Sequence, residues 1–262
     1  MMRLVFKKET DTNMKFWFHI HPTRLEAVSL MKRAEAVISS LGGERVDHPM
    51  AADFTCAIGG DGTVIAASRL SRKPIIGINA GTLGYLPKIE PENLEESLLR
   101  IMKGDYTLEN RMTLSVSCAN CPPQTALNDA AILTPGAGVI RFTVNVDGVK
   151  LMRYTADGLI AATPTGSTGY SLSAGGPIVD PTSQSITLTP VAPHTLVNRA
   201  IILSPESHIS IECENRSILS VDGNKKEVDE GAKIEIRRSE ETVQFVSFGR
   251  ESFIERLRKK LS

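Results

Sequence analysis

The sequence predicts two joined domains, an α/β domain followed by an all-β, sandwich-like domain. Up to about residue 105, short apolar runs alternate with stretches of helical periodicity, the pattern of a parallel sheet with helices on both faces. From about residue 110, short β-branched runs separated by turn residues replace it. The chain then returns to a helical pattern over 251–261. We therefore expect residues 14–105 with 250–262 to form the α/β domain, and residues 106–249 to form the β domain.

The composition limits the classes of function. The chain has 262 residues, 41% of them hydrophobic and 23% charged, with a formal net charge of zero. A neutral chain argues against a nucleic-acid partner that is bound by phosphate neutralisation. No apolar run approaches the roughly 20 residues that span a bilayer, and the first residues lack the apolar core of a signal peptide. We expect a cytoplasmic protein with neither a nucleic-acid nor a membrane partner.

The first domain is predicted to begin with a strand at Lys15–Ile20. The polar stretch before Met14 either is a loosely ordered extension or adds a strand. A helix follows the first strand, because Thr23 and Glu26 have the spacing of a capping box and Gly42 provides a stop. Its apolar positions recur every three or four residues: Val28, Met31, Ala34, Ile38 and Leu41.

Two further strands and a helix complete this domain. Phe54–Ile58 and Ile75–Asn79 are short apolar runs typical of buried strands. Pro91 opens a helix, since proline is favoured in the first helical turn. Its apolar face is formed by Leu94, Leu98 and Ile101. The alternation predicts a Rossmann-like parallel sheet.

The second domain is predicted to consist of short strands joined in part by tight hairpins. Asp147-Gly148 and Asp222-Gly223 suit such turns, because both central residues can adopt positive φ. The strands are expected at Leu114–Cys118, Ala131–Thr134, Ile140–Val146, Leu159–Thr163, Ile186–Thr189, Ala200–Leu203, Ile209–Cys213, Ile218–Val221, Lys233–Arg237 and Thr242–Phe248. A last helix, with Phe253, Leu257 and Leu261 on one face, is predicted to return to the first domain.

The most informative motif is Gly59-Gly60-Asp61-Gly62-Thr63, between an apolar strand and a helix. Glycines allow backbone N–H groups to approach an anion closely. A helix N-terminus adds a partial positive charge that favours phosphate. A carboxylate in an anion site usually holds a metal ion or accepts a proton, so Asp61 is the first candidate for a catalytic residue.

A second motif extends from Asp157 to Pro177 and is rich in glycine and hydroxyl side chains. Such a segment supplies many hydrogen-bond donors to a polar ligand, and Tyr170 could stack on a base. Three plainer interpretations stay open. The segment could be a linker, Asp157 could belong to a hairpin, and Tyr170 could be a core residue.

Two shorter motifs are less specific. Asn128-Asp129 stands just before a strand, where both residue types are common in turns. Cys118-Ala119-Asn120-Cys121 is a lone pair of cysteines without the second pair that a structural zinc site needs. A turn between strands is the simplest interpretation of the cysteine pair, with a local disulfide or a metal site as the alternatives.

Taken in order, these motifs resemble those of NAD kinases. The resemblance rests on the glycine turn, on Asn128-Asp129 in place of the usual Asn-Glu, and on the long Thr163–Pro177 segment. Gly77–Leu86 and Pro193–Arg199 are similar to two further family segments. The glycine turn is shared with diacylglycerol, sphingosine and phosphofructokinases, whereas the long segment is specific to NAD kinases.

The resemblance implies phosphoryl transfer from ATP, or from another donor such as polyphosphate, to the adenosine 2′-hydroxyl of NAD. It assigns Asp61 as the general base. It implies a divalent cation, Mg²⁺, that is carried with the nucleotide, no metal site built by the protein, and a homo-oligomer such as a dimer or tetramer. It implies substrate-binding residues at Gly59, Gly60, Asp61, Gly62, Thr63, Asn128, Asp129, Asp157, Thr168, Gly169, Tyr170, Ser171, Leu172, Ser173, Ala192 and Asn224.

The chain departs from the family pattern at several positions. Asp129 is one methylene shorter than the usual Glu, and Gly169 replaces an Ala. Thr155 occupies a position that is often basic in the family. Arg153, two residues earlier, is a candidate to replace that basic residue, and the sequence leaves this open. These changes leave the choice between NAD and NADH open. Two other functions compete, a lipid kinase that shares the glycine turn and a regulator that binds NAD without catalysis.

Overall fold

The computed structural model describes residues 13–21, 23–81, 84–119, 121–195, 198–249 and 253–261. The chain forms two compact units, which we call the N-terminal unit (Met1–Glu109 with Val243–Ser262) and the β unit (Asn110–Thr242). Two long strands, β5 (Thr107–Cys118) and β16 (Lys233–Ser247), each begin in one unit and end in the other. Each unit is described by itself below.

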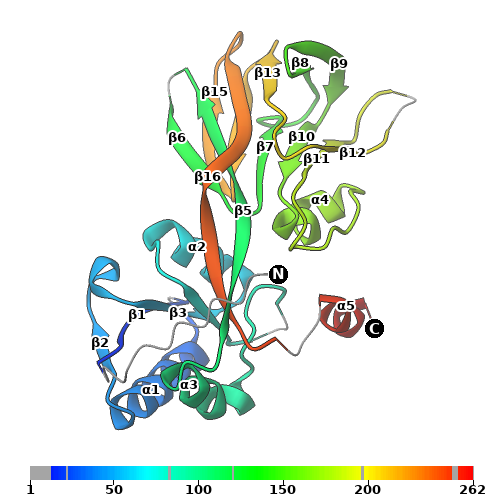
Figure 1. The fold of residues 1–262 in the computed structure, drawn as a ribbon. Coiled ribbons are helices and arrows are strands. Elements are labelled where there is room, and N and C mark those ends of the chain that lie inside the picture. Colours follow the sequence, from blue (N-terminus) through cyan, green and yellow to red (C-terminus); the bar gives the residue numbers. More distant parts are fainter. Residues whose placement is uncertain are drawn as a thin grey trace. The chain divides into compact units, whose positions relative to one another are not determined.

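The N-terminal unit is built on a parallel sheet (Figure 1). Its strands lie in the order β2 (Glu44–Val46), β1 (Lys15–Ile20), β3 (Phe54–Gly59) and β4 (Ile75–Asn79). The end of β16 lies parallel to β4, with Phe245 beside Ile75. β3 and β4 are buried along their whole length, as expected for central parallel strands covered on both faces.

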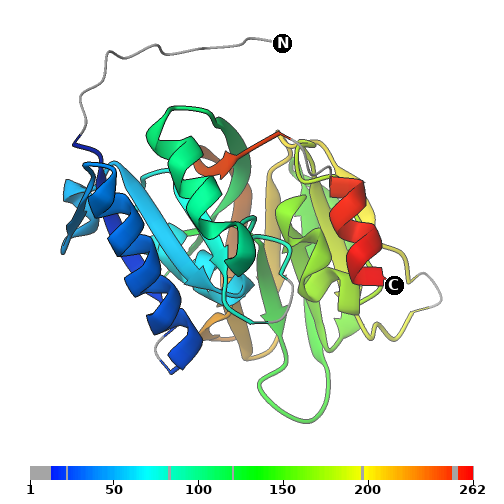
Figure 2. The same cartoon turned by 90° about the horizontal axis from the view of Figure 1, so that it is seen from below.

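Helices α1 (Leu25–Ser40) and α3 (Leu94–Met102) cover one face of this sheet, seen from that side in Figure 2. Alternate side chains of β3, Phe54, Cys56 and Ile58, pack with these helices in one core cluster. α2 (Asp61–Leu70) follows β3 directly and lies on the other face (Figure 1). Two short 3₁₀ helices, η1 (Pro49–Ala51) and η2 (Pro91–Asn93), complete the connections.

The predicted start of α1 was wrong in detail. The residue before the helix is Arg24, and no side chain caps it, whereas Thr23 donates its backbone N–H to His21 Nδ1. The buried face is formed by Ala27, Leu30, Ala34 and Ile38, one position away from the predicted face at its start. Ala34 and Ile38 were predicted correctly, whereas Ala27 and Leu30 were not counted.

The β unit is a sandwich of two antiparallel sheets. One contains β16, β13, β8 and β9, with β5 beside β16 and β6 beside β5; the other follows the order β12-β11-β10-β7-β14-β15. The strands not yet bounded are β6 (Cys121–Ala126), β7 (Asp129–Leu133), β8 (Ile140–Val146), β9 (Val149–Ala156), β10 (Gly158–Ala162), β11 (Ile186–Val191), β12 (Ile201–Leu203), β13 (Ile209–Cys213), β14 (Ser217–Val221) and β15 (Asn224–Val228).

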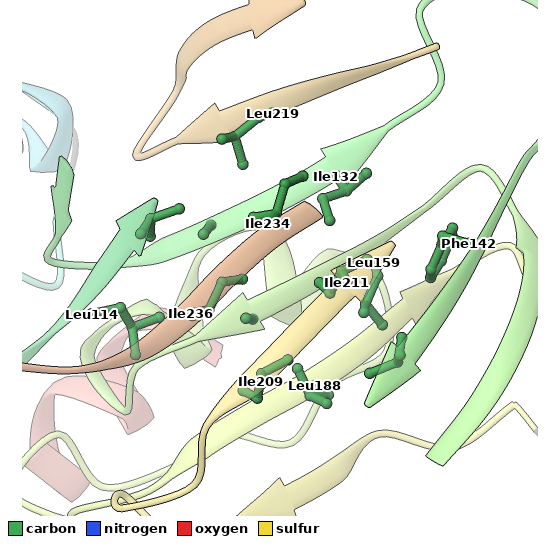
Figure 3. Close-up of a cluster of buried hydrophobic side chains, with 14 of the residues drawn as sticks. Leu114, Ile132, Phe142, Leu159, Leu188, Ile209, Ile211, Leu219, Ile234 and Ile236 are labelled. Atoms are coloured by element: carbon green, nitrogen blue, oxygen red, sulfur yellow. The ribbon is translucent and has the colours of Figure 1, made fainter. Parts of the chain in front are cut away.

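The core of the β unit lies between its two sheets (Figure 3). Phe142, Ile211 and Ile234 come from one sheet and Ile132 and Leu159 from the other, and all are buried. Alternate residues of each strand therefore meet in one apolar layer, which is how a β-sandwich excludes water.

Both Asp-Gly hairpins are confirmed. Asp147 and Gly148 join β8 to β9, Asp222 and Gly223 join β14 to β15, and all four residues have positive φ. The second strand of each hairpin was missed because its first residues are exposed in succession, so apolar and polar side chains do not alternate there. The two strands predicted at Lys233–Arg237 and Thr242–Phe248 are one continuous strand, β16.

The last helix, α5 (Phe253–Leu261), belongs to the N-terminal unit, as predicted. Within the described residues, no helix has the length and apolar character needed to cross a membrane. Cys118 is disulfide-bonded and pairs with the backbone of Cys121 across the turn between β5 and β6. β5 and β6 pair on either side of this segment, as the turn interpretation predicts.

Candidate functional site

The glycine turn links a buried strand to a helix N-terminus. β3 ends at Gly59, Gly60 precedes the helix, and Asp61 is the first residue of α2. The backbone N–H of Thr63 donates to the Gly60 carbonyl at 3.0 Å, which closes the first turn. A helix of this length directs its free N–H groups and positive end toward the turn.

Packing within the protein requires only one of the three glycines of the turn. A Cβ on Gly59 would lie 2.2 Å from Thr63 Oγ1, so packing within the protein requires glycine there. A Cβ on Gly60 or Gly62 would meet no atom of the described residues within 4 Å. Neither of these two has a positive φ, so neither packing nor backbone geometry requires glycine at these positions. The free space beside them suits a ligand that approaches the backbone.

Asp61 is held by a loop from a distant part of the chain. Its carboxylate accepts the backbone N–H of Tyr85 at 3.2 Å and that of Leu86 at 2.9 Å. A Cβ on Gly84 would lie 2.5 Å from Asp61 Oδ1, so only glycine allows this contact. Burial and the Asp61 charge raise the pKa of the Tyr85 phenol. The side chain of Asp61 is therefore fixed in one orientation.

One residue near this turn was missed by the sequence analysis. Arg24 Nη1 donates to the Ala80 carbonyl at 2.6 Å, and the Ala80 N–H donates to the Gly59 carbonyl at 3.3 Å. Arg24 thus contributes a cation beside the glycine turn. It had been counted only as part of a capping box, and no pattern along the sequence indicates its contact with Ala80.

Asn79, at the end of β4, has an acceptor without a partner. Its Nδ2 donates to Glu90 Oε2 at 2.8 Å, whereas its buried Oδ1 accepts no hydrogen bond from the described residues. An unpaired buried acceptor is costly unless a ligand or water satisfies it.

In the β unit, Asp222 fixes the segment that contains Asn128 and Asp129. The carboxylate of Asp222 accepts the backbone N–H groups of Leu127, Asn128 and Asp129 at 2.8–3.0 Å. Asp222 lies in the hairpin turn before β15, more than 90 residues along the chain. Asn128 lies in the short connection between β6 and β7, as the turn interpretation predicts, and the Asp222 carboxylate holds this connection.

Asp129 is a buried carboxyl with an unusual pKa. Its side chain is 8% exposed, and burial together with the nearby Asp222 charge raises its pKa to about 7. The Oδ1 of neighbouring Asn128 is buried and has no hydrogen-bond partner among the described residues. Both groups therefore have hydrogen-bonding capacity that the protein itself leaves unused.

The Thr163–Ser173 segment packs against Asn128. Thr163 N donates to the Asn128 carbonyl at 2.8 Å, and a Cβ on Gly166 would lie 2.1 Å from that carbonyl oxygen. The segment forms η3 (Thr165–Thr168) and the short helix α4 (Tyr170–Ser173). It is thus an ordered element of the β unit and not a linker.

Several side chains of this segment differ in exposure. Thr165, Ser167 and Ser171 are buried, and Ser171 Oγ shares a hydrogen bond with Thr189 Oγ1 at 2.9 Å. Tyr170 is 41% exposed, so it is not a core aromatic. A Cβ on Gly169 would lie 3.6 Å from Asn128 Nδ2 and 3.9 Å from Asp129 Oδ2. Gly169 therefore lies beside both polar side chains.

The remaining predicted residues lie on strand ends. Asp157 connects β9 of one sheet to β10 of the other, so it is not a hairpin residue, and its N–H donates to the Val191 carbonyl at 3.0 Å. Ala192 follows with a φ of 43°. Asn224 is exposed at the start of β15, opposite Val221. The exposed Arg153 is ion-paired with Glu214.

The predicted residues thus fall into two sets, one in each unit. Thr82 and Leu83, together with Leu196 and Val197, lie outside the described residues, as do residues 1–12 of the predicted extension. The part of the chain that the structure describes contains no group of three or more His, Cys, Asp or Glu side chains that could hold a metal ion.

Comparison with known families decides between the competing functions. The ATP-NAD kinase N-terminal domain matches residues 6–106, and the ATP-NAD kinase C-terminal domain matches residues 127–248. The chain belongs to the NAD kinase family. It is therefore an enzyme, a kinase that acts on NAD. These matches give no support to the lipid-kinase and regulator alternatives.

Individual NAD kinases agree with this assignment. That of Bacteroides fragilis is 40% identical over 80% of this chain and 76% of its own length. That of Geobacter sulfurreducens is 39% identical over 90% of this chain and 89% of its own.

Two solved structures share the fold. An NAD kinase from Archaeoglobus fulgidus in complex with ATP has a TM-score of 0.79 and 32% identity, covering 95% of this chain and 97% of that one. Yeast NADH kinase complexed with NADH has a TM-score of 0.88, covering 96% and 88%; at 22% identity, this likeness shows the fold alone.

Proposed function

We propose that Asp61 is the general base that accepts the proton of the adenosine 2′-hydroxyl of NAD. As the O–H bond breaks, the hydroxyl oxygen attacks the terminal phosphorus of ATP or another phosphoryl donor, the bridging P–O bond breaks, and NADP and the shortened donor leave. The observation that supports this role is the carboxylate at the start of α2, fixed by the N–H groups of Tyr85 and Leu86. General-base catalysis contributes about 10²–10⁴ in rate.

The glycine turn would bind the phosphates of the donor. The space beside Gly60 and Gly62, which no atom from the described parts of the chain fills, allows backbone N–H groups to reach phosphate oxygens. Thr63 would add its hydroxyl, Gly59 would hold the turn closed, and Arg24 would add positive charge beside it. A single carboxylate in the turn suits Mg²⁺ that arrives on the nucleotide and keeps several of its waters. When bound, the ion would neutralise phosphate charge.

The β unit would bind the dinucleotide. Asn128 Oδ1, which is buried and accepts no hydrogen bond from any residue that the structure describes, and the Asp129 carboxyl would hydrogen-bond the adenosine ribose. The exposed ring of Tyr170 would stack on a base, and the other residues of the Thr168–Ser173 segment would line the bound dinucleotide. Asp157, Ala192 and Asn224 are the remaining members of the proposed set. The cytoplasmic location and the homo-oligomeric state stay predictions.

An Asp61→Asn variant tests the proposed base. We expect NADP formation from NAD, ATP and Mg²⁺ to fall by about 10²-fold or more in kcat, because the amide does not accept the proton. The dissociation constant for NAD, measured by calorimetry, should stay unchanged. Asp47→Asn, at an exposed position of the same unit, is the matched control. Wild-type turnover in the Asp61 variant would reject Asp61 as the base.

A further inference from the structure

The last helix places a buried arginine against the loop that holds Asp61. Arg256 of α5 is 7% exposed, although Ile254, two positions earlier, is 66% exposed. Arg256 Nη1 donates to the Tyr85 carbonyl at 3.2 Å and also to the Pro87 carbonyl. Burying a guanidinium is costly unless polar partners compensate it, and here backbone carbonyls of one short segment do so.

The Tyr85–Pro87 segment is therefore held from two sides. The Tyr85 and Leu86 N–H groups donate to Asp61, and the Tyr85 and Pro87 carbonyls accept from Arg256. Gly84 also lies close to Pro87, since a Cβ on Gly84 would lie 2.8 Å from Pro87 Cδ. Arg256 is therefore connected to Asp61 through the backbone of this segment, and this connection needs no direct contact between the two side chains.

A second cation from the same face of the helix strengthens the contact. Lys260 lies four residues after Arg256, one turn along α5, and its Nζ lies 4.4 Å from the centre of the Tyr85 ring. Both cations thus converge on Tyr85, one on its backbone and the other on its ring.

We propose that Arg256 is a positioning residue for Asp61. It keeps the Tyr85–Pro87 backbone in the conformation that aims two N–H groups at the carboxylate. The inference rests on the proposed role of Asp61 as general base. A small displacement of a catalytic group is costly, since rate depends steeply on the geometry of attack.

An Arg256→Met variant removes the guanidinium and keeps much of the apolar stem. We expect kcat to fall about 10-fold while the dissociation constant for NAD stays unchanged, because geometry and not substrate affinity is lost. Arg256→Lys retains one donor group and should give an intermediate kcat. Arg258→Met, an exposed arginine on the same helix, is the matched control and should behave as wild type.

Amide hydrogen exchange at Tyr85 and Leu86 reports the loop without using activity. Exchange at these two amides should speed up in Arg256→Met and, to a smaller extent, in Arg256→Lys, and stay slow in Arg258→Met. If Arg256→Met does not fold, Arg256→Lys decides by the same two measurements. A folded Arg256 variant with wild-type kcat and wild-type exchange would overturn the proposal.

A double-mutant cycle separates the two proposals. If Arg256 acts through Asp61, Arg256→Met should lower kcat in the wild-type background but change it little in an Asp61→Asn background. An equal loss in both backgrounds would overturn the positioning role. Unchanged turnover in Asp61→Asn alone would instead reject Asp61 as the base, whereas the exchange measurement would still report whether Arg256 holds the loop.

Discussion

The glycines of the Gly59–Thr63 turn differ in what an added methyl group would meet. At Gly59 it would overlap Thr63, so that glycine serves the fold. At Gly62 it would project into space that no atom of the described residues fills, and this is where the donor phosphates are proposed to bind. Replacing Gly62 with alanine should therefore lower activity without lowering stability.

Gly62→Ala makes this contrast measurable. The substitution lies in the first turn of α2, where Ala is favoured over Gly by about 0.5–1 kcal/mol, so we expect an unchanged or slightly higher melting temperature. The new methyl should obstruct donor phosphates and raise the KM for ATP about 10-fold or more, since the loss of one close contact costs 1–2 kcal/mol. Steady-state kinetics and thermal unfolding on the same samples provide the check.

Gly136→Ala serves as the control for this pair of measurements. A Cβ there also meets no protein atom within 4 Å, but the residue lies in an exposed loop of the β unit. It should leave the KM for ATP unchanged. A Gly62→Ala enzyme with wild-type KM would argue against phosphate binding at the turn.

At the level of single residues, the sequence indicated which residues are candidates for the site, but not which residues form hydrogen bonds with them. Asp61 was recognisable because a carboxylate is unexpected in an anion-binding turn. Its partners Tyr85 and Leu86 lie about 25 positions away, and Asp222 lies more than 90 positions from Asn128. Such pairings depend on how strands and loops meet in three dimensions, and no local pattern records them.

At the level of elements, the turns of the two Asp-Gly hairpins have similar backbone conformations but contact different segments. Gly148 and Gly223 have φ values of 79° and 85°. The aspartate of each turn accepts backbone N–H groups from another segment. Asp147 holds His208, whereas Asp222 holds the Asn128-Asp129 segment. Only the second hairpin is connected to the proposed ribose-binding residues.

The variants Gly148→Ala and Gly223→Ala should distinguish the hairpin that only stabilises the fold from the one that also affects NAD binding. A Cβ in the left-handed region costs about 1–2 kcal/mol, so both should lower the free energy of unfolding by similar amounts. Only Gly223→Ala should also raise the KM for NAD, because strain in its turn displaces Asp222. Urea unfolding and NAD titrations test this, and an equal rise in KM for both variants would contradict it.

Elements were predictable where the sequence has a continuous apolar run or a distinctive turn. The apolar runs of β3 and β4 and the hairpin turns have strong local signals. β9 was missed because exposed Val149, Lys150 and Leu151 remove its alternation. β16 was divided because the charged residues Glu240 and Glu241, which are exposed in its middle, resemble a loop when only the sequence is considered.

At the level of the whole molecule, the buried Asp129 carboxyl lowers stability at neutral pH. Its pKa rises from 3.8 to about 7 on folding, so the folded state binds more protons between these values. The free energy of unfolding should therefore decrease as pH rises from about 4 to 7, and level off above 7. The total contribution is on the order of 4 kcal/mol at most.

Asp129→Asn should remove this part of the pH dependence. The neutral amide has no charge to bury, so the variant should gain stability over the wild type as pH rises, with little difference near pH 4. Urea unfolding at several pH values, with Asp47→Asn as an exposed control, measures the difference. Parallel curves for the Asp129 variant and the wild type would show that the carboxyl does not titrate in this range.

The β unit is an insertion whose two ends lie on paired strands. The chain enters it along β5 and leaves it along β16, and Thr113 Oγ1 donates to the Glu241 carbonyl at 2.6 Å near both boundaries. One contiguous stretch of gene, coding for residues 110–242, therefore encodes every residue proposed to bind the dinucleotide. Recombination could exchange this stretch between relatives as a cassette. A change of dinucleotide preference could in this way spread through evolution while the Asp61 turn is inherited intact.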